Sequence, residues 1–426
     1  MKPTTIFFVL ITLIVTLNVT AQNSIFDCKT SEVNALYFQQ YPKALNEYKQ
    51  FNAYSKDFVS NLKQNKSSSS TSYVIPVVVH VYGEVQGGLT VDYQTIVNSI
   101  AQVNEEFQGL NADYNTVDSE FIGIRGSLDI EFKLAKLDPD GNCTDGVIFH
   151  PESAGQGNIN SPIVANDAWD NYKYMNVYIT NDLYGVGFLT YTGVAWYPST
   201  EMSDENLARI VYNGIYLTGN TDRESASTLT HEFGHFFNLI HTHEGNCRDL
   251  DLVMDTPPEI LYSDIEGESN CSQIIQCNTH INYENYMGYK AYYGGCYKMF
   301  TQGQMNRVIA ALNHPTRKPL WQPSNLIATG VNSDCNLSSN DLTLENKVIT
   351  YPNPINDTFT ITSDAFNGED ISIHIYTILG EKVYQKEYIN AESSLTIENS
   401  IKTSGYYIVK VVLKDGRQLN IPLIKK

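Results

Sequence analysis

The sequence predicts two folded parts: an α/β domain built around a twisted mixed sheet, and a small all-β sandwich after it. Segments with strand and helix periodicity alternate between residues 73 and 197, which is typical of an α/β domain. Residues 231–241 read HEFGHFFNLIH, a largely apolar segment with the character of a buried helix. From Val348 onward, short alternating segments are separated by turns, and this pattern favours a β-sandwich.

The expected elements of the first domain follow from the same periodicity. The β-branched run at 73–82 predicts a buried strand, and Asp92 to Gln108 has the apolar spacing of a helix. Residues 331–347 are rich in Asn, Ser and Asp, which indicates a linker. Further strands are expected at 130–137, 175–180 and 187–197, so that the main domain covers 71–330, the linker 331–347 and the sandwich 348–426.

The first 21 residues have the pattern of a cleaved signal peptide. Lys2 gives a positive start, Ile6 to Leu17 is nearly all apolar, and small residues at 19–21 precede a cut after Ala21. No later segment has eighteen uninterrupted apolar residues, so we expect the mature protein to have no transmembrane segment. The sequence therefore predicts an exported protein.

The chain is strongly acidic. It has 47 Asp and Glu residues against 28 Lys and Arg residues, which gives a net charge of −19. Because like charges repel at long range, such a surface disfavours nucleic acid and anionic membranes as partners.

Residues 22–70 are interpreted as a propeptide with its processed linker. The part up to about residue 65 is helical in pattern and polar in composition. Lys66 and the four serines at 67–70 form a run suited to proteolytic nicking. An aromatic stripe, expected to be a packing face, contains Tyr37, Phe38, Tyr41, Tyr48 and Phe51.

The histidine pattern at 231–241 predicts a zinc site. His231 and His235 lie one helical turn apart, so both imidazoles can reach one ion. Glu232 lies beside the first ligand and can act as general base on a zinc-activated water. A solvated helix face is the alternative, but apolar neighbours predict burial, and buried unpaired His and Glu side chains are costly.

A third ligand requires the chain to leave the helix after His235. Asn238 lies at the expected turn, and Asn tolerates the positive φ that such a turn needs. His241 can then join the first two histidines. An acidic third ligand further downstream is the alternative, and Asp255 lies near that distance.

These residues resemble the metzincin signature, HExxHxx(G/N)xxH. The NYMGY segment at 285–289 is similar to the methionine turn of that family. The resemblance implies that Met287 forms an apolar floor beneath the histidines. It also implies that Tyr289 stabilises the oxyanion of the tetrahedral intermediate.

Among metzincins, the chain most resembles the pappalysin, or cytophagalysin, family. The segments that carry this resemblance span roughly residues 73–325. It implies a metzincin catalytic domain and a secreted zinc endopeptidase, made as a zymogen, that hydrolyses peptide bonds of extracellular proteins. A surface adhesin on an inactive metalloprotease scaffold is the alternative, which Glu232 disfavours. The segments are IPVVVHVY at 75–82, DPDGNCTDGV at 138–147, DTPP at 255–258 and CYKMFTQGQMNRV at 296–308.

The resemblance also bears on the substrate. It implies that residues 187–197 form an edge strand that pairs with an extended protein or peptide substrate. Some relatives prefer a basic residue after the cut and use acidic groups near the methionine turn. Residues 290–295 contain no carboxylate, so that preference does not carry over to this chain.

The chain has seven cysteines, and export predicts that most are paired. The four at 247, 271, 277 and 296 allow three pairings, and a second metal cluster is the alternative. The family resemblance implies the bridges Cys247–Cys277 and Cys271–Cys296.

Two further sites are implied by the resemblance. Asp251, Asp255 and Thr256 lie in a loop similar to a family calcium site, with a solvated loop as the alternative. In related proenzymes a cysteine thiolate occupies the zinc, which makes Cys28 a latency switch. The usual neighbour is Gly, whereas this chain has Lys29. The alternatives for Cys28 are a bridge to Cys143 or Cys335, or a free thiol.

The C-terminal part resembles the sorting domain of the type IX secretion system. The matching segments are YPNP at 351–354, IYTILGEKVYQ at 375–385 and the stretch at 404–426. The resemblance implies that residues 348–426 engage the type IX machinery, so that the protein crosses the periplasm and becomes secreted or cell-surface bound. A sugar-binding or adhesive sandwich is the alternative.

Overall fold

The computed structural model divides the chain into two compact units, Met1–Ser333 and Asp334–Lys426. The predicted signal peptide and residues 333–347 of the predicted linker lie outside the described residues. Within the described part of the chain, no helix combines the length and hydrophobicity needed to cross a bilayer. The described residues are 28–64, 71–248, 250–261, 274–289, 296–332, 348–363, 366–378, 380–398, 401–414 and 418–426.

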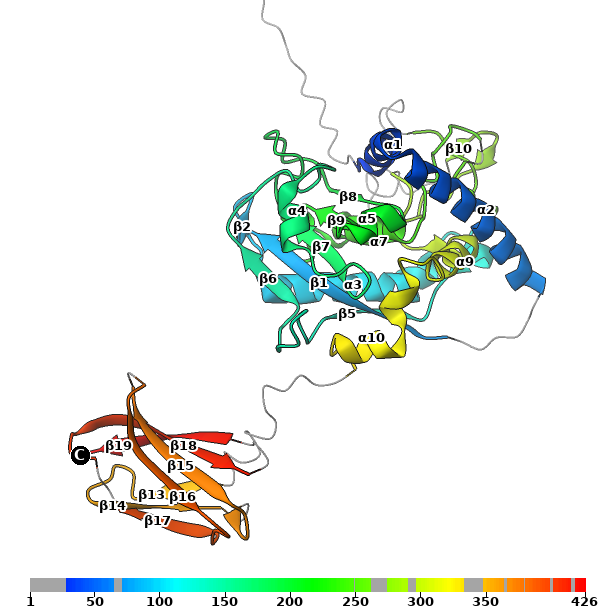
Figure 1. The fold of residues 1–426 in the computed structure, drawn as a ribbon. Helices are drawn as coiled ribbons and strands as arrows, with labels where there is room; N and C mark the ends of the chain where they lie inside the picture. Colours follow the sequence, from blue (N-terminus) through cyan, green and yellow to red (C-terminus); the bar gives the residue numbers. More distant parts are fainter. Residues whose placement is uncertain are drawn as a thin grey trace, which may run out of the picture. The chain divides into compact units, whose positions relative to one another are not determined.

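The first unit contains a six-stranded mixed sheet with the order β5-β1-β7-β9-β8, in which β6 also pairs with β1 (Figure 1). All neighbours are parallel except β8, which runs antiparallel to β9 and forms an edge. The strands are β1 (Tyr73–Tyr82), β5 (Ile130–Leu134), β6 (Val147–His150), β7 (Met175–Ile179), β8 (Gly193–Ala195) and β9 (Ile210–Tyr212).

The strand expected at 187–197 is shorter than predicted. Only Gly193–Ala195 forms β8. The Asp182 carboxylate accepts hydrogen bonds from the backbone N–H groups of residues 185–187. These bonds curl the chain into a loop, so the segment cannot extend alongside β9.

Helices pack on both faces of this sheet. Helix α3 (Tyr93–Gln108) begins at Asp92, whose side chain accepts from the Thr95 N–H, and it packs on β5 and α7 (Thr228–Phe236). Two N-terminal helices, α1 (Thr30–Gln40) and α2 (Pro42–Gln64), lie where the sequence predicted helix, and α2 packs against α9 (Gln302–Ala311) (Figure 1). The other helices are α4 (Pro162–Asp167), α5 (Thr200–Asp204), α6 (Arg223–Ala226) and α10 (Pro323–Ala328).

Short elements complete the first unit. The two-residue strands pair as β2 with β3, β4 with β12, and β10 with β11. They are β2 (Val85–Gln86), β3 (Leu89–Thr90), β4 (Arg125–Gly126), β10 (Ile275–Gln276), β11 (Thr279–His280) and β12 (Phe300–Thr301), and the 3-10 helices are Tyr114–Thr116, Ile122–Ile124, Gly214–Tyr216 and Lys318–Trp321.

The two largest apolar clusters of the first unit join its sheet to the helices. The larger one joins the sheet to α3 and α7 through fully buried rings such as Phe107, Phe132 and Phe233, and it also includes Phe51 of α2. The smaller one joins β8 and β9 to Val33 and Tyr37 of α1. The N-terminal helices therefore contribute side chains to both clusters.

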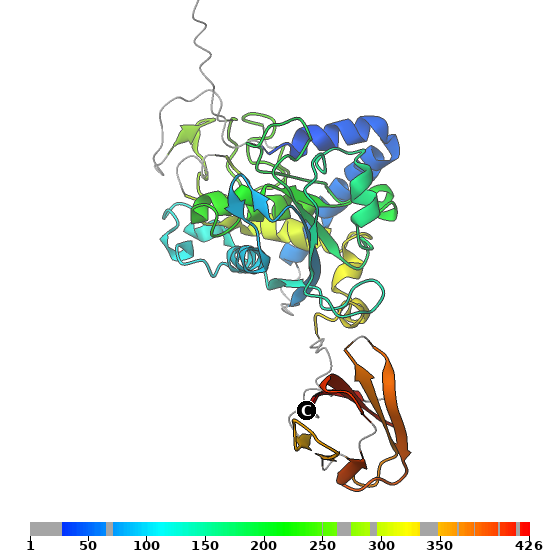
Figure 2. The same cartoon turned by 90° about the vertical axis from the view of Figure 1, so that its left-hand side faces the viewer.

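The second unit is a sandwich of two antiparallel sheets, as predicted (Figure 2). One sheet has the order β13-β14-β17 and the other β16-β15-β18-β19. Alternate residues such as Ile373, Val409 and Val411 point into a shared apolar core. The strands are β13 (Ile349–Tyr351), β14 (Thr358–Thr362), β15 (Ile371–Thr377), β16 (Lys382–Tyr388), β17 (Ser394–Glu398), β18 (Gly405–Leu413) and β19 (Gln418–Lys425).

Candidate metal centre

Three histidines converge at the end of α7. Their Nε2 atoms lie 2.9 Å apart for His231 and His235, 3.0 Å for His235 and His241, and 3.2 Å for His231 and His241. All three side chains are buried, at 0–2% exposure. Zn–N bonds of about 2.0–2.1 Å in a tetrahedral site place nitrogen ligands about 3.3–3.4 Å apart, so this spacing suits a single ion.

Backbone carbonyls fix the tautomer of two of these rings. His231 Nδ1 lies 2.7 Å from Tyr286 O, and His235 Nδ1 lies 2.7 Å from Leu239 O. A carbonyl can only accept, so each Nδ1 carries the proton and each Nε2 presents a lone pair. Burial lowers the pKa of His231 to about 4. The rings therefore stay neutral, and the Nε2 lone pairs of His231 and His235 can bind one cation between them.

The turn after α7 brings His241 to the other two histidines. Helix α7 ends at Phe236, and Asn238 has a φ of 67°. The Leu239 N–H then donates to Gly234 O and closes the helix end. Left-handed backbone at Asn238 is what the sequence predicted, because Asn adopts it more readily than other non-glycine residues.

Cys28 joins the histidines as a fourth potential ligand. One ligand atom from each of Cys28, His231, His235 and His241 lies within 4.8 Å of the others. The Cys28 Sγ atom lies 3.5 Å from His235 Nε2, and the side chain is 2% exposed. Burial, followed by the Glu232 charge, raises the pKa of the Cys28 thiol well above its usual range. A bound dication reverses that preference, since a coordinating thiol is deprotonated. The donor set of three neutral imidazoles and one thiol thus fits zinc.

The Glu232 carboxylate lies beside the histidine cluster and packs directly against Gly193 of β8. A Cβ on Gly193 would lie 2.6 Å from Glu232 Cγ, so β8 can approach α7 only without a side chain there. Glu232 Oε2 accepts from Thr30 Oγ1 at 3.3 Å, whereas Oε1 has no partner among the described atoms. Burial raises the pKa of Glu232 to about 8.

Met287 lies beneath α7, where the family resemblance implied an apolar floor. Its side chain is fully buried, and its N–H donates to Asn285 Oδ1. A Cβ on Gly234 would lie 2.6 Å from Met287 Sδ. The glycine inside the HEFGH segment therefore allows the methionine turn to approach the helix.

Tyr289 reaches the same cluster from the methionine turn. Its hydroxyl donates to the backbone carbonyl of Cys28 at 2.9 Å and lies 3.3 Å from His241 Nε2. The Tyr289 hydroxyl thus contacts both a peptide carbonyl, that of Cys28, and one histidine of the cluster. Residues 290–295, considered above for substrate preference, lie outside the described residues.

The start of α1 covers the cluster and the edge strand. Thr30 Oγ1 accepts from the Ala195 N–H at 3.0 Å. The Asn34 side chain donates to Ala195 O at 3.0 Å and accepts from the Tyr197 N–H at 3.1 Å. Ser31 Oγ lies 3.2 Å from His241 Nδ1. These contacts occupy backbone groups that an added strand would otherwise use.

Sequence reasoning missed several of these residues. Thr30, Ser31 and Asn34 lie 160 to 210 positions from their partners, so no local pattern reveals them. No sequence pattern reveals the role of Gly193, because that role depends on the distance between β8 and α7 in the folded structure.

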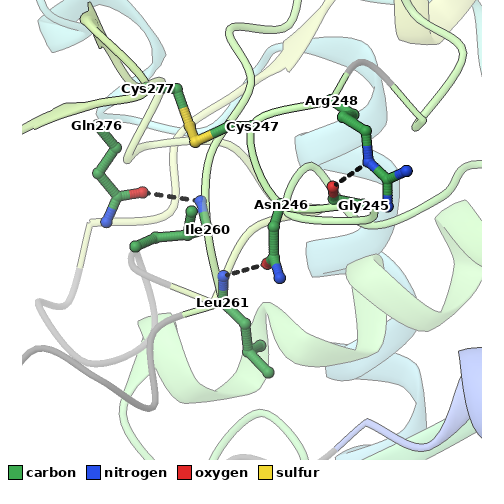
Figure 3. The surroundings of a disulfide bond; sticks show 8 residues. All are labelled: Gly245, Asn246, Cys247, Arg248, Ile260, Leu261, Gln276 and Cys277. Carbon is green, nitrogen blue, oxygen red and sulfur yellow. Dashed lines mark hydrogen bonds between the residues drawn. A yellow bond between two sulfur atoms is a disulfide. The ribbon is translucent and has the colours of Figure 1, made fainter.

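One predicted disulfide is present in the described residues. Cys247 and Cys277 are bonded, with their Cα atoms 5.2 Å apart (Figure 3). Cys143 and Cys296 are also disulfide-bonded. Cys271, the predicted partner of Cys296, and Cys335 lie outside the described residues. Cys28 is a free thiol, so the bridges to Cys143 or Cys335 considered above are excluded in this structure.

The three residues of the predicted calcium site do not share one arrangement. The Asp251 carboxylate accepts from Thr256 Oγ1 at 2.5 Å. The Asp255 carboxylate instead accepts from Thr301 Oγ1 at 2.7 Å and from the Gly303 N–H at 2.8 Å, and so caps the start of α9. Asp255 is also not a ligand at the histidine cluster.

Family models match both units. Residues 158–313 match the family described as pregnancy-associated plasma protein-A, which is the pappalysin peptidase family. Residues 349–425 match the secretion system C-terminal sorting domain.

Curated relatives agree with the first match. An extracellular metalloprotease of Arthroderma otae is 26% identical over 235 residues, which cover 54% of this chain and 79% of that protein. An extracellular metalloprotease of Sordaria macrospora is 34% identical over 151 residues, which cover 33% of this chain and 49% of that protein. The match to the second relative thus spans about half of its length.

Solved structures have the same fold as the first unit. Mature mirolysin of Tannerella forsythia, in complex with a cleaved peptide, is 27% identical with a TM-score of 0.50, covering 61% of this chain and 99% of that one. A promirolysin mutant of the same organism is 25% identical with a TM-score of 0.51, covering 68% and 95%. The first unit is therefore similar to pappalysin-type zinc metalloendopeptidases, and the second unit to a secretion system C-terminal sorting domain.

Proposed function

We propose that the chain is an exported zymogen of a zinc endopeptidase whose catalytic residues are Glu232 and Tyr289. In this proposal His231, His235 and His241 hold the zinc ion, and Cys28 is its fourth ligand in the latent enzyme. The observation that carries the proposal is the convergence of three Nε2 atoms within 3.2 Å, with a buried thiol beside them.

Each side chain has a distinct role in peptide hydrolysis. Zinc, when bound, polarises the scissile carbonyl and lowers the pKa of the attacking water. Glu232 takes a proton from that water and delivers it to the leaving amine. Tyr289 donates a hydrogen bond to the carbonyl oxygen as negative charge develops there.

The substrate is an extended segment of an extracellular protein that adds to the edge of the sheet at β8. The backbone groups of Ala195 and Tyr197 bind the Thr30 and Asn34 side chains in this structure. Once α1 leaves, the same groups are free to pair with a peptide backbone. The similarity to mirolysin, whose structure contains a cleaved peptide, supports a peptide as the substrate.

Latency follows from the position of α1. Cys28, Thr30 and Ser31 contact three of the groups that would act on a substrate. The similarity to promirolysin covers 68% of this chain, against 61% for the mature form. The similarity to the pro-form of a protease supports a propeptide in this chain, which we place within residues 22–70. The thiol acts with Lys29 rather than Gly as its neighbour.

Export depends on both ends of the chain in this proposal. Residues 1–21 direct the protein into the periplasm, and residues 348–426 direct it through the type IX machinery. Deletion of 348–426 should trap the protein in the periplasm. Normal export without these residues would refute the sorting role.

Peptide hydrolysis and bound zinc together test the catalytic proposal. The processed enzyme should hydrolyse casein, bind one zinc per chain and lose activity with a zinc chelator. Glu232→Ala should keep its zinc and lose at least about a thousandfold in activity, because the general base is gone. An active Glu232→Ala variant, or a purified protein without zinc, would overturn the proposal.

A further inference from the structure

Helix α2 packs on the rest of the first unit through one face, and this face makes no contact with the side chains of Cys28, His231, His235 or His241. Four of its residues, Glu47, Tyr48, Phe51 and Asn52, contact the unit at a spacing of i, i+1, i+4 and i+5. This spacing places them on one side of the helix. Together with their partners described below, they define what we call the α2 docking surface.

The apolar part of the α2 docking surface lies against buried rings. Phe51 is 7% exposed, belongs to the same cluster as Phe233 of α7, and meets the His314 ring edge-on with centroids 4.6 Å apart. The Tyr48 ring stacks on Tyr197, with centroids 5.3 Å apart. Burial of aromatic rings supplies affinity that does not depend on any metal ligand.

The polar part of the α2 docking surface begins with the Glu47 carboxylate, which lies against buried groups of the first unit. Both Glu47 oxygens accept from the Thr200 N–H, and Glu47 Oε1 lies 3.3 Å from Nε2 of the buried His314. Glu47 therefore supplies acceptors to hydrogen-bond donors that the fold keeps largely out of water.

Asn52 contacts the turn between two metal-binding histidines. Its Oδ1 accepts from Asn238 Nδ2 at 3.1 Å and from Arg307 Nη2 at 2.7 Å. The Arg307 Nε in turn donates to Asn238 O at 2.7 Å. Arg307 is 3% exposed, so loss of Asn52 leaves a buried guanidinium with fewer partners.

We infer that α2 holds the N-terminal segment on the enzyme after the chain is cut between α2 and β1, so that this cut alone does not activate it. The inference rests on the proposed function in taking residues 22–70 as the propeptide. Only Tyr41 separates α1 from α2. While α2 stays docked, α1 returns to the cleft as an intramolecular event, at an effective concentration on the order of millimolar. Activation then needs a second event that removes α2.

The test replaces residues 65–70 of the full chain with the recognition sequence of a specific protease. In a Glu232→Ala background, which prevents self-cleavage, the chain is cut and the fragments are followed by size-exclusion chromatography and native mass spectrometry. We expect the N-terminal fragment to co-elute with the remainder. Cys28→Ser should also retain it, because the docking surface is separate from the metal ligands.

The contrast is with substitutions in α2 itself. The double variant Glu47→Ala and Asn52→Ala should hold the fragment on the order of a hundredfold more weakly, since buried hydrogen-bond donors lose their acceptors. Lys49→Ala with Lys56→Ala, on the exposed side of α2, is the matched control and should retain it. A synthetic peptide of residues 42–64, added in excess to the unsubstituted cut complex, should displace the fragment. This experiment tests the same surface without any substitution, so a misfolded variant cannot affect its result.

Two results would overturn the inference. One is release of the fragment from the unsubstituted cut chain. The other is a fragment lost by Cys28→Ser and kept by the Glu47 and Asn52 double variant. These results do not depend on catalysis, since Glu232→Ala is inactive throughout. Failure of the proposed function would appear instead as absent zinc or absent hydrolysis in the Glu232 form.

Discussion

The Tyr289 hydroxyl donates to the backbone carbonyl of Cys28, with 2.9 Å between the two oxygens. The tyrosine that is proposed to stabilise an oxyanion thus already holds a peptide carbonyl of its own chain. We predict that Tyr289→Phe lowers kcat of the processed enzyme by about a hundredfold and leaves KM nearly unchanged. Initial rates on a fluorogenic peptide measure both constants. Tyr283→Phe, whose hydroxyl donates to Asp118, is the control and should stay within about twofold of wild type. A kcat for Tyr289→Phe equal to that of the control would exclude the role.

Because β8 lies so close to α7, we predict that activity is sensitive to a side chain at Gly193. An added Cβ at Gly193 would lie 2.7 Å from Glu232 Oε1, so Gly193→Ala must displace the carboxylate. We expect activity to fall at least about tenfold while zinc content stays at one per chain, because misplacement of a catalytic group is costly. Gly123→Ala, where a Cβ meets nothing within 4 Å, is the control. Full activity in Gly193→Ala would show that Glu232 tolerates displacement.

The left-handed turn at Asn238 predicts a difference between two substitutions. Asn238→Ala and Asn238→Gly both lose the contact with Asn52, but only Ala is strained at a φ of 67°. The Ala variant should be about 1–2 kcal/mol less stable than the Gly variant. Thermal unfolding of the two proteins measures this difference. Equal melting temperatures would mean that the turn relaxes without strain.

The position of Cys28 predicts a sulfur ligand in the latent enzyme. X-ray absorption at the zinc edge of the uncut chain should show one sulfur and three nitrogen neighbours. In Cys28→Ser the sulfur signal should disappear, and peptide hydrolysis before processing should rise at least tenfold over wild type. Leu36→Ala, at an exposed position of α1, should keep both the sulfur signal and the latency. A wild-type spectrum without sulfur would refute the switch.

For the loop at 251–256, we predict that calcium raises the melting temperature and that Asp251 and Asp255 differ in their contribution to this effect. Added calcium, but not magnesium, should raise the melting temperature of the zinc-loaded protein, and Asp251→Asn should remove that rise. Asp255→Asn should lower stability with or without calcium, since this carboxylate caps α9. Equilibrium dialysis without calcium retention would remove the calcium prediction.

The sequence was most informative where chemistry depends on short spacing. The HEFGH helix, the Asn238 turn and the strand at 73–82 are local patterns, and each lies where it was predicted. The strand at 187–197 was overestimated because its β propensity says nothing about Asp182, whose carboxylate bonds the loop before β8. The contacts of Thr30 and Asn34 with Ala195 were out of reach for the same reason: they exist only once the sheet and α1 have come together.

The way α1 covers the sheet edge has a consequence for self-digestion. Thr30 and Asn34 satisfy β8 with side chains, while the α1 backbone remains helical. A helix keeps its N–H and C=O groups in bonds to itself, so it offers the edge no extended chain to align. The sheet edge and the histidine cluster are thus covered by a segment in the wrong conformation for cleavage. The N-terminal segment can thus block the active site of its own chain without being cleaved there.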